Sequence, residues 1–503
     1  MKKYDLISAR RELCELQRKL SAFNHAMAVI YYDGATAAPS GTASNRGVTL
    51  SVLSEETYRL STSDETVCLL EFLDSRKEEL GEKEKRQVFL LLREIRQTAK
   101  IPVDEYVAFE KLTVEAEDVW RRAKRDSDFE SFRPFLEKIF MTEKRFAGYI
   151  EPDSDPYDFR LGQFEEGLNR KTLDRFFTEL RSEIVPLIGK VTAADQIDDS
   201  VRYGRFDSGR QEELAHYLMK TIGLDPAHVS LSTTEHPFTT SLGSHFDVRI
   251  TTHYHEDDLL SSFYSVVHEG GHALYDTGSA DDLAYTVLDG GVSMSIHESQ
   301  SRFYENIIGR SSAFCELVFP KLAELFPEEM KGKSPEDLFL AANKSEPSLI
   351  RIEADELTYC LHIMVRYELE KRIFDGDLRV GDLPGEWNRL YREYLGIDVP
   401  DDRRGVLQDM HWASGLIGYF PSYALGSAYG AQFLAKMKET VDVDSCVRAG
   451  DFARINRWNL ENIWKHGGVY TPSELLCRVL GGPFDPKYYT DYLKKKFSGI
   501  YRL

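Results

Sequence analysis

The segment that most constrains the fold is LLSSFYSVVHEGGHALYDTG, residues 259–278, which carries two histidines four residues apart. Residues four apart lie on one face of a helix, so the imidazoles of His268 and His272 can bind the same tetrahedral zinc ion. Glu269 can then reach the open position of that ion and act as the base that activates a metal-bound water. The segment predicts a catalytic metal site on a helix.

Two glycines stand inside this helix, and each lowers helix stability by about 1 kcal/mol relative to alanine. We therefore expect another backbone or a substrate to pack very close to Gly270 and Gly271. An HExxH pattern can arise by chance in a long chain rich in Glu and His. Here it lies in an apolar helical run and follows a candidate strand, which favours the metal site over chance.

A catalytic zinc site needs a third protein ligand and an open fourth position. The chain has no HExxHxxGxxH extension, because the position six beyond His272 is Gly278. The best candidate is Glu298 in GVSMSIHESQSRFYENIIG, with Arg302 and Glu305 at helical spacing as its partners. His297 and Glu305 remain rivals for the ligand role. Without the HExxH motif, the same acids and arginine would more simply predict a solvated helix face.

The rest of the chain is mostly helical in pattern. From Lys2 to about Arg181, Glu, Lys, Arg and Leu recur at helical spacing, and the Gly- and Pro-containing segment Tyr31–Gly47 predicts a loop. From Thr234 to Tyr254 β-branched and aromatic residues prevail, and the alternating run Phe246–Thr252 indicates one or two short strands. Helices resume after Asp257 and continue nearly to the end.

These patterns predict a mainly α protein with a small β-sheet beside the HExxH helix. We expect one large two-lobed unit, residues 1–503, with an N-terminal helical lobe over 1–200 and a catalytic lobe with the metal site over 201–503.

Charge and composition exclude several classes of function. The formal net charge of −20 argues against a nucleic-acid partner, because phosphate binding needs a basic surface. The start of the chain lacks the apolar core of a signal peptide, and no stretch approaches the ~18 apolar residues of a membrane span. The six cysteines are scattered with no CxxC pair, which predicts free thiols in a reducing compartment. We therefore expect a cytoplasmic protein without a membrane partner.

Around the HExxH motif and in several other segments, the chain resembles the carboxypeptidase Taq family of metallocarboxypeptidases. The resemblance spans most of the chain and rests on six motifs in order: HPF (His236–Phe238), DVRIT (Asp247–Thr251), HEGGH (His268–His272), HESQ (His297–Gln300), IRIEAD (Ile350–Asp355) and GVLQDMHW (Gly405–Trp412). Two positions depart from the family pattern. The chain has His253 where TRY often follows DVRIT, and Tyr304 where tryptophan often stands. These departures concern substrate preference.

The resemblance implies a deep active-site groove through a largely helical body and a homodimer. It also implies zinc or cobalt (Zn²⁺ or Co²⁺) as the metal. The implied reaction is removal of C-terminal amino acids, with broad specificity, from peptides that have a free C-terminus.

Peptide hydrolysis also needs a donor for the oxyanion and an anchor for the substrate. His411 and Tyr423 are the candidate oxyanion donors, since each can donate a hydrogen bond from a Gly-flanked aromatic segment. Each alone is more often a hydrogen-bonded core residue.

For the α-carboxylate of the substrate, arginine is the best-suited anchor because it can bind a carboxylate with two parallel hydrogen bonds. Arg351 is the first choice and Arg249 the second, while His236, stiffened by Pro237, can also face the substrate. The structural alternatives are an ion pair of Arg351 with Glu353, Asp355 or Glu356, an ion pair of Arg249 with Asp247, and a buried hydrogen-bonded His236.

Two other functions compete. An endo-acting oligopeptidase of the helical HExxH class would share the metal site and differ only in lacking the C-terminal anchor. A non-catalytic helical scaffold with a vestigial metal site would not need Glu269, because that residue is not required for binding zinc.

Overall fold

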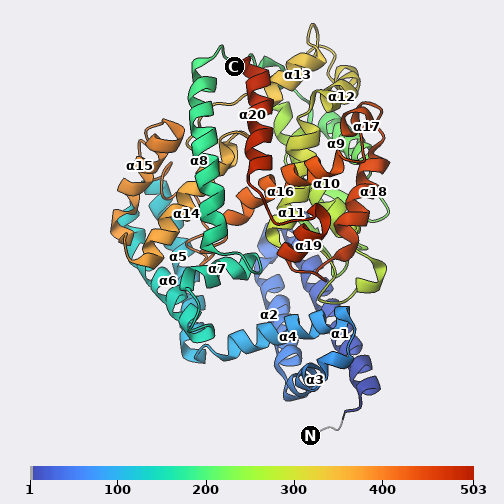
Figure 1. Ribbon diagram of the computed structural model, residues 1–503, viewed down its shortest axis with the longest axis vertical. Helices are drawn as coiled ribbons and strands as arrows, with labels where there is room; N and C mark the ends of the chain where they lie inside the picture. Colours follow the sequence, from blue (N-terminus) through green and yellow to red (C-terminus); the bar gives the residue numbers. More distant parts are fainter. Residues whose placement is uncertain (1–3) are drawn as a thin grey trace.

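The computed structural model describes residues 4–503 and shows a largely helical body with one small sheet, as predicted (Figure 1). The α-helices are α1 (Leu6–Thr36), α2 (Ala43–Thr62), α3 (Asp64–Ser75), α4 (Glu82–Ala99), α5 (Val103–Asp126), α6 (Phe129–Ile150), α7 (Pro156–Phe164), α8 (Arg170–Ala193), α9 (Ser208–Ile222), α10 (Leu259–Thr277), α11 (Met294–Arg302), α12 (Ser312–Leu325), α13 (Pro335–Ala342), α14 (Tyr359–Asp375), α15 (Leu383–Leu395), α16 (Pro421–Met437), α17 (Val443–Arg448), α18 (Phe452–Asn462), α19 (Pro472–Leu480) and α20 (Lys487–Tyr501).

The sheet has three short strands, β1 (Val229–Thr233), β2 (Thr239–Ser241) and β3 (Val248–Thr252), in the order β1-β3-β2. β1 pairs with β3 in parallel and β2 pairs with β3 antiparallel. The predicted strands correspond to β2 and β3, and β1 lies just before the predicted segment. Its sequence, VSLST, alternates but has only two apolar residues, Val229 and Leu231, which is too short a pattern to predict a strand.

The loop predicted over Tyr31–Gly47 is shorter in the structure. α1 continues to Thr36, where the amides of Ala37 and Ala38 both donate to the carbonyl of Asp33, and α2 begins at Ala43. Gly34 lies inside α1 because α2 approaches there: a Cβ on Gly34 would lie 2.9 Å from Arg46 Nε. The glycine therefore marks a close helix contact, and the prediction of a loop at this residue was wrong.

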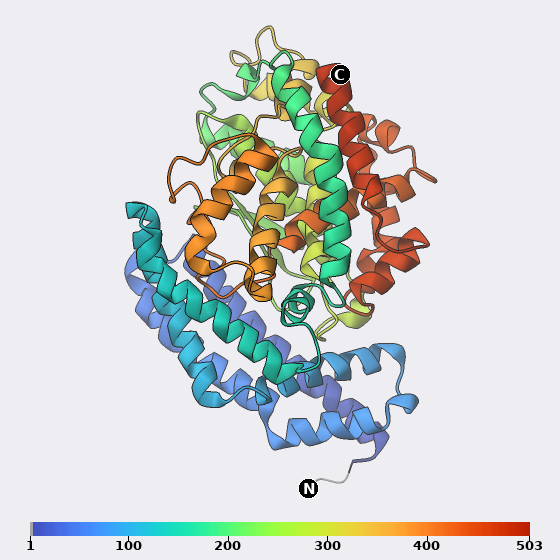
Figure 2. The same ribbon diagram turned by 60° about the vertical axis from the view of Figure 1, so that its left-hand side comes forward.

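The apolar side chains form two main cores. A small one joins α1, α3 and α4, from Ala9 to Leu92, and a large one extends from Ala116 to Tyr501. Figure 2 shows the N-terminal helices at the lower left, beside the body that holds the second core. The large core crosses residue 200, so the division into lobes at that position stays a prediction.

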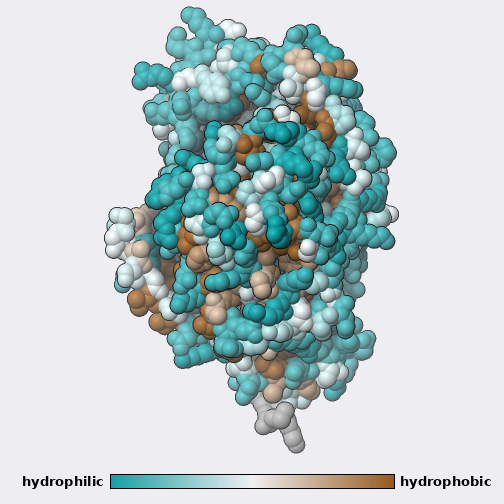
Figure 3. All heavy atoms as spheres, turned by 90° about the vertical axis from the view of Figure 1, so that its left-hand side faces the viewer, coloured by the Kyte–Doolittle hydropathy of each residue, from teal (hydrophilic) through white to brown (hydrophobic). Residues whose placement is uncertain are grey.

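The surface in Figure 3 is mostly hydrophilic, with hydrophobic side chains gathered near its middle and at its lower left. Across residues 4–503, none of the helices combines the length and apolar character that crossing a bilayer requires.

α10 is packed on several sides. It contacts α9, α11 and strands β2 and β3, and most of its residues are buried. α11 in turn packs against α16 and continues directly into a π-helix, Phe303–Gly309. The HExxH helix is therefore held between the small sheet and the α11 segment.

Candidate metal centre

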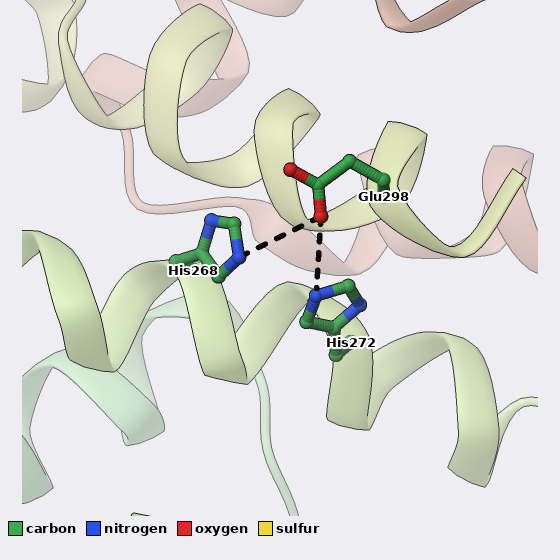
Figure 4. A group of neighbouring side chains, drawn as sticks. All are labelled: His268, His272 and Glu298. Carbon is green, nitrogen blue, oxygen red and sulfur yellow. Dashed lines mark ion pairs between the residues drawn. The ribbon is translucent and has the colours of Figure 1, made fainter. Parts of the chain in front are cut away.

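Two neighbouring helices bring together three side chains that fit a metal ion (Figure 4). His268 and His272 project from α10, and Glu298 projects toward them from α11. Glu298 Oε2 lies 3.8 Å from His268 Nε2 and 3.6 Å from His272 Nε2, and the three ligand atoms lie within 4.8 Å of one another. An ion about 2 Å from each atom would bind two imidazole nitrogens and a carboxylate oxygen, which is a common catalytic zinc set.

Close backbone packing makes this convergence possible. A Cβ on Gly271 would lie 2.7 Å from Gln300 O and from Ser301 Cα in α11. On the other side of α11, a Cβ on Gly426 of α16 would lie 2.5 Å from Glu298 Cγ. The expectation that another backbone packs close to the glycines is confirmed at Gly271, where α11 carries Glu298 to the histidines. Gly270 instead faces the side chain of Ile222.

The other nitrogen of each histidine contacts a supporting side chain. His268 Nδ1 lies 2.8 Å from Glu305 Oε2, and His272 Nδ1 lies 2.6 Å from His297 Nδ1. His297 Nε2 lies 2.8 Å from Asp276 Oδ1. Glu305 and His297, the rivals of Glu298, therefore lie behind the histidines, in the position where metal sites usually place supporting groups.

These contacts indicate the tautomers that we assign. A carboxylate only accepts hydrogen bonds, so His268 carries its proton on Nδ1 and keeps the Nε2 lone pair free for a metal. The Nδ1 atoms of His272 and His297 share one hydrogen bond, and binding a metal through His272 Nε2 requires that His272 is its donor and that His297, bonded to Asp276 through Nε2, is its acceptor. Burial, followed by the adjacent imidazoles, holds the pKa of His272 well below its ordinary value, which favours the neutral form that a metal requires.

Two arginines orient the carboxylates. Arg302 donates to Glu298 Oε1 at 2.8 Å and to Glu305 Oε2 at 3.0 Å, and Arg310 donates to Glu305 Oε1 at 2.9 Å. Glu298 is thus held with Oε2 toward the histidines. The sequence indicated Arg302 through its helical spacing. It did not indicate Arg310, because an α-helix would not place residues five apart on one face, whereas the π-helix here has a wider turn.

Glu269 lies beside the metal ligands in the same cavity. Its Oε2 accepts a hydrogen bond from Thr239 Oγ1 at 2.6 Å. The side chain is buried, and burial raises the pKa of Glu269 above its ordinary value. A carboxyl group with a raised pKa is better matched to proton transfer near neutral pH than an exposed one.

The cavity that contains these residues has a volume of about 1240 Å³. His268, Glu269 and Glu298 line it, and so do Arg351 and Tyr423. The cavity is large enough for a small peptide, since typical ligand sites enclose about 300–1,000 Å³.

Arg351 is 6% exposed, and its guanidinium group donates to two other side chains. Its Nε and Nη2 donate to Asp409 at 3.1 and 2.9 Å, and its Nη1 donates to Tyr359 at 3.1 Å. Arg366 also donates to Asp409, at 2.7 Å from its Nε. The ion-pair partner of Arg351 is therefore Asp409 and none of the neighbouring acids Glu353, Asp355 and Glu356 that the sequence suggested.

His411 and Tyr423 lie together, with 3.3 Å between His411 Nε2 and the Tyr423 hydroxyl. Of this pair, Tyr423 is the residue that lines the cavity. Burial lowers the pKa of His411 to about 4, so this imidazole is neutral at neutral pH. The buried carboxylate of Glu370 holds the segment that joins these two residues. It accepts hydrogen bonds from Trp412 Nε1 at 2.7 Å and from the Gly418 amide at 2.9 Å.

His236 and Arg249 are not brought to the metal ligands in the same way. His236 is exposed, and its neighbour Pro237 is the residue of HPF that lines the cavity. Arg249 donates to Asp247 Oδ2 at 2.9 Å and lies over the ring of Tyr32, beside a separate pocket. The ion pair with Asp247 is the structural alternative that the sequence left open.

Comparison with known proteins agrees with the motifs. The family model described as carboxypeptidase Taq (M32) metallopeptidase matches residues 12–497. Carboxypeptidase 1 of Bacillus subtilis is 40% identical over 495 residues, which cover 98% of this chain and 99% of that protein. Thermostable carboxypeptidase 1 of Pyrococcus furiosus is 35% identical over 491 residues, which cover 97% and 98%. The solved M32 carboxypeptidase of Deinococcus radiodurans R1 has a TM-score of 0.96 at 34% identity and covers 99% of this chain and 100% of that chain.

Proposed function

Because the chain belongs to the carboxypeptidase Taq (M32) family of metallopeptidases, it is a metal-dependent peptide hydrolase, and we propose that it removes amino acids from the free C-termini of peptides. The observation that carries the proposal is the cavity in which His268, His272 and Glu298 converge beside Glu269 and a buried arginine. Membership of a family of hydrolases leaves the non-catalytic scaffold without support.

His268, His272 and Glu298 are the proposed metal ligands, and Zn²⁺ is the proposed ion, with Co²⁺ as the alternative. Their nitrogen and carboxylate donors and their spacing fit either ion. When bound, such an ion polarises the scissile carbonyl and lowers the pKa of a water molecule.

Glu269 is the proposed general base. It would take a proton from the attacking water and return it to the leaving amine. Its burial and its position next to His268 support this role. Tyr423 is the proposed donor to the oxyanion because it lines the cavity and has a hydroxyl group to donate. Neutral His411, whose Nε2 lies 3.3 Å from that hydroxyl, would orient it.

Arg351 is the proposed anchor for the substrate carboxylate. Two guanidinium groups, Arg351 and Arg366, share the single carboxylate of Asp409, and His411 beside them is neutral. The buried cluster therefore carries one uncompensated positive charge at the cavity wall. One α-carboxylate of a peptide would neutralise it, and charge-assisted hydrogen bonds of this kind are strong.

This anchor predicts how the enzyme responds to substrate charge. Amidation of the peptide C-terminus should suppress cleavage by the wild type, because the amide cannot neutralise the cluster. Arg351→Ala should lower kcat/KM on free-acid peptides by about ten- to a hundredfold and erase most of the preference for them over amidated peptides. Mass spectrometry of the products, as ladders shortened from the C-terminus, measures both effects.

Arg249→Ala provides a matched comparison, since it removes the same group from outside the cavity. It should keep the preference for free-acid peptides. Loss of the preference in Arg249→Ala but not in Arg351→Ala would move the anchor to Arg249. Equal cleavage of free-acid and amidated peptides by the wild type would instead favour the endo-acting oligopeptidase.

We also propose that the chain forms a homodimer, as its resemblance to the family suggested. α2, all of whose residues are described, buries none of them, and Val48 and Val52 are 65% and 55% exposed. A second copy would cover such apolar residues. Sedimentation velocity should give twice the chain mass of 57.7 kDa, and Val48→Asp with Val52→Asp should shift it toward the monomer. A monomeric wild type would contradict the proposal.

A single domain over residues 1–503 and a cytoplasmic location stay predictions from the sequence.

A further inference from the structure

The three-residue strand β2 contacts the catalytic helix through two hydroxyl groups. Successive side chains of a strand point to opposite faces, so Thr239 and Ser241 share one face and Thr240 points the other way. α10 lies against that shared face, where Glu269 and Asp276, seven residues apart, are about two helical turns from each other. Each hydroxyl contacts one of these two acids.

The first contact holds the proposed base. Thr239 Oγ1 lies 2.6 Å from Glu269 Oε2 and 3.0 Å from the main-chain carbonyl of Glu269. A hydroxyl has one hydrogen to donate, and the carboxylate is the nearer and more strongly accepting of the two oxygens. The bond restricts the Glu269 side chain to one orientation, which leaves its other oxygen, Oε1, available for a water molecule.

The second contact reaches a metal ligand through a chain of hydrogen bonds. Ser241 Oγ donates to Asp276 Oδ2 at 2.7 Å, and Asp276 Oδ1 lies 2.8 Å from His297 Nε2. His297 Nδ1 lies 2.6 Å from His272 Nδ1. Ser241 therefore fixes the Asp276 carboxylate, which orients His297, which orients the imidazole of His272.

The strand itself is held by β3, and the turn after it is held by α1. β2 pairs with β3, with Thr239 opposite Ile250 and Ser241 opposite Val248. The turn that follows β2 is bound by α1, because Ser21 Oγ donates to the Gly243 carbonyl at 2.7 Å and His25 Nδ1 lies 2.7 Å from the Leu242 carbonyl. A fixed backbone is what a side chain needs in order to orient another group.

We propose that β2 is a positioning strand with two separable tasks. Thr239 orients the carboxylate of Glu269 for proton transfer, and Ser241 orients His272 for metal binding through Asp276 and His297. The inference rests on the proposed function and extends it to two residues outside the ligands and the base. Supporting groups of metal ligands commonly change metal affinity by about 10- to 100-fold, and a misplaced catalytic group costs a similar factor in rate.

The two tasks predict that one variant of the strand loses kcat and the other loses Zn²⁺ affinity. Thr239→Val removes the hydroxyl and keeps the shape. It should lower kcat by about ten- to a hundredfold with KM and metal affinity unchanged. Ser241→Ala should weaken Zn²⁺ binding by about 10- to 100-fold and leave kcat near the wild-type value once the site is saturated with Zn²⁺. Steady-state kinetics on a free-acid peptide and chelator competition for Zn²⁺ measure these quantities.

Three further variants separate positioning from general damage to the strand. Thr239→Ser and Ser241→Thr keep a hydroxyl and should restore most of the lost function. Thr240→Val makes the same change on the opposite face, where its hydroxyl has no hydrogen-bond partner among residues 4–503, and should change neither quantity. Melting temperatures of all variants show whether each has folded.

The proposal is overturned if Thr239→Val keeps the wild-type kcat or Ser241→Ala keeps the wild-type Zn²⁺ affinity. It is also overturned if Thr240→Val lowers kcat as much as Thr239→Val does, or lowers Zn²⁺ affinity as much as Ser241→Ala does. Zn²⁺ affinity is measured without substrate, so it does not depend on where peptides are cut. The kcat of each variant relative to the wild type can likewise be compared whether the enzyme cuts at the C-terminus or inside the peptide. A wild type that binds no metal would contradict the proposed function itself, before any variant is compared.

Discussion

Glu269→Gln should lower kcat by about 100- to 10,000-fold while the metal content stays that of the wild type. Glutamine has nearly the same shape as glutamate and can still accept the hydrogen bond from Thr239 Oγ1, which lies 2.6 Å from Glu269 Oε2. Its amide cannot take a proton from water, so only the base is lost. The ligands His268 and His272 on the same helix remain in place.

The measurement combines steady-state kinetics on a free-acid peptide with elemental analysis of the purified protein. Glu235→Gln makes the same change at an exposed position before β2 and should leave both values unchanged. A loss of less than about tenfold in Glu269→Gln would show that another group is the base, since a positioned general base contributes at least about 100-fold. A loss of metal would show that Glu269 supports the ligands.

Glu298→Ala should weaken metal binding by more than about 100-fold, which is beyond the usual effect of losing a supporting group. The variant removes a ligand and also one of the two carboxylate partners of Arg302, which donates to Glu298 Oε1 at 2.8 Å, so Arg302 and Arg310 would then share Glu305 alone. Chelator competition measures the affinity. In the wild type, a chelator should abolish activity and Zn²⁺ or Co²⁺ should restore it.

Glu305→Ala and His297→Ala test the rival ligands. Both side chains contact a histidine from behind, so each variant should weaken metal binding by about 10- to 100-fold, less than Glu298→Ala. Normal metal binding in Glu298→Ala, together with its loss in either rival, would make Glu298 the wrong third ligand. Circular dichroism of the metal-free variants separates loss of a ligand from loss of the fold.

The sequence predicted what depends on local spacing. To predict that His268 and His272 share one face, only the helical repeat was needed. To predict the close contact at Gly271, only the rule that a glycine inside a helix marks such a contact was needed. Asp276 was missed although it stands four residues after His272 on the same helix face. A search of that face for acids would have found it.

What the sequence could not predict depends on contacts between distant segments. Glu298, His297 and Glu305 lie in one short stretch, and only the crossing of α10 and α11 determines which of them faces both histidines. Arg351 forms its ion pair with Asp409, 58 residues later in the chain. The acids close to Arg351 in sequence therefore did not indicate its partner. Thr239 belongs to a strand of three residues, which is too short for a pattern to indicate which side chain faces a helix.

The contact of Gly271 with the backbone of α11 also bears on the kind of ion that the centre accepts. The main chain at Glu298 has little room to move toward or away from the histidines, because Gly271 and Gly426 pack closely against α11 on its two sides. Packed interiors are stiff, so the close packing of the two helices limits how far the ligands can rearrange around an ion. Two imidazole nitrogens and one carboxylate oxygen suit Zn²⁺ or Co²⁺, whereas Ca²⁺ takes six to eight oxygen ligands, and a rigid centre with one carboxylate cannot rearrange to supply them.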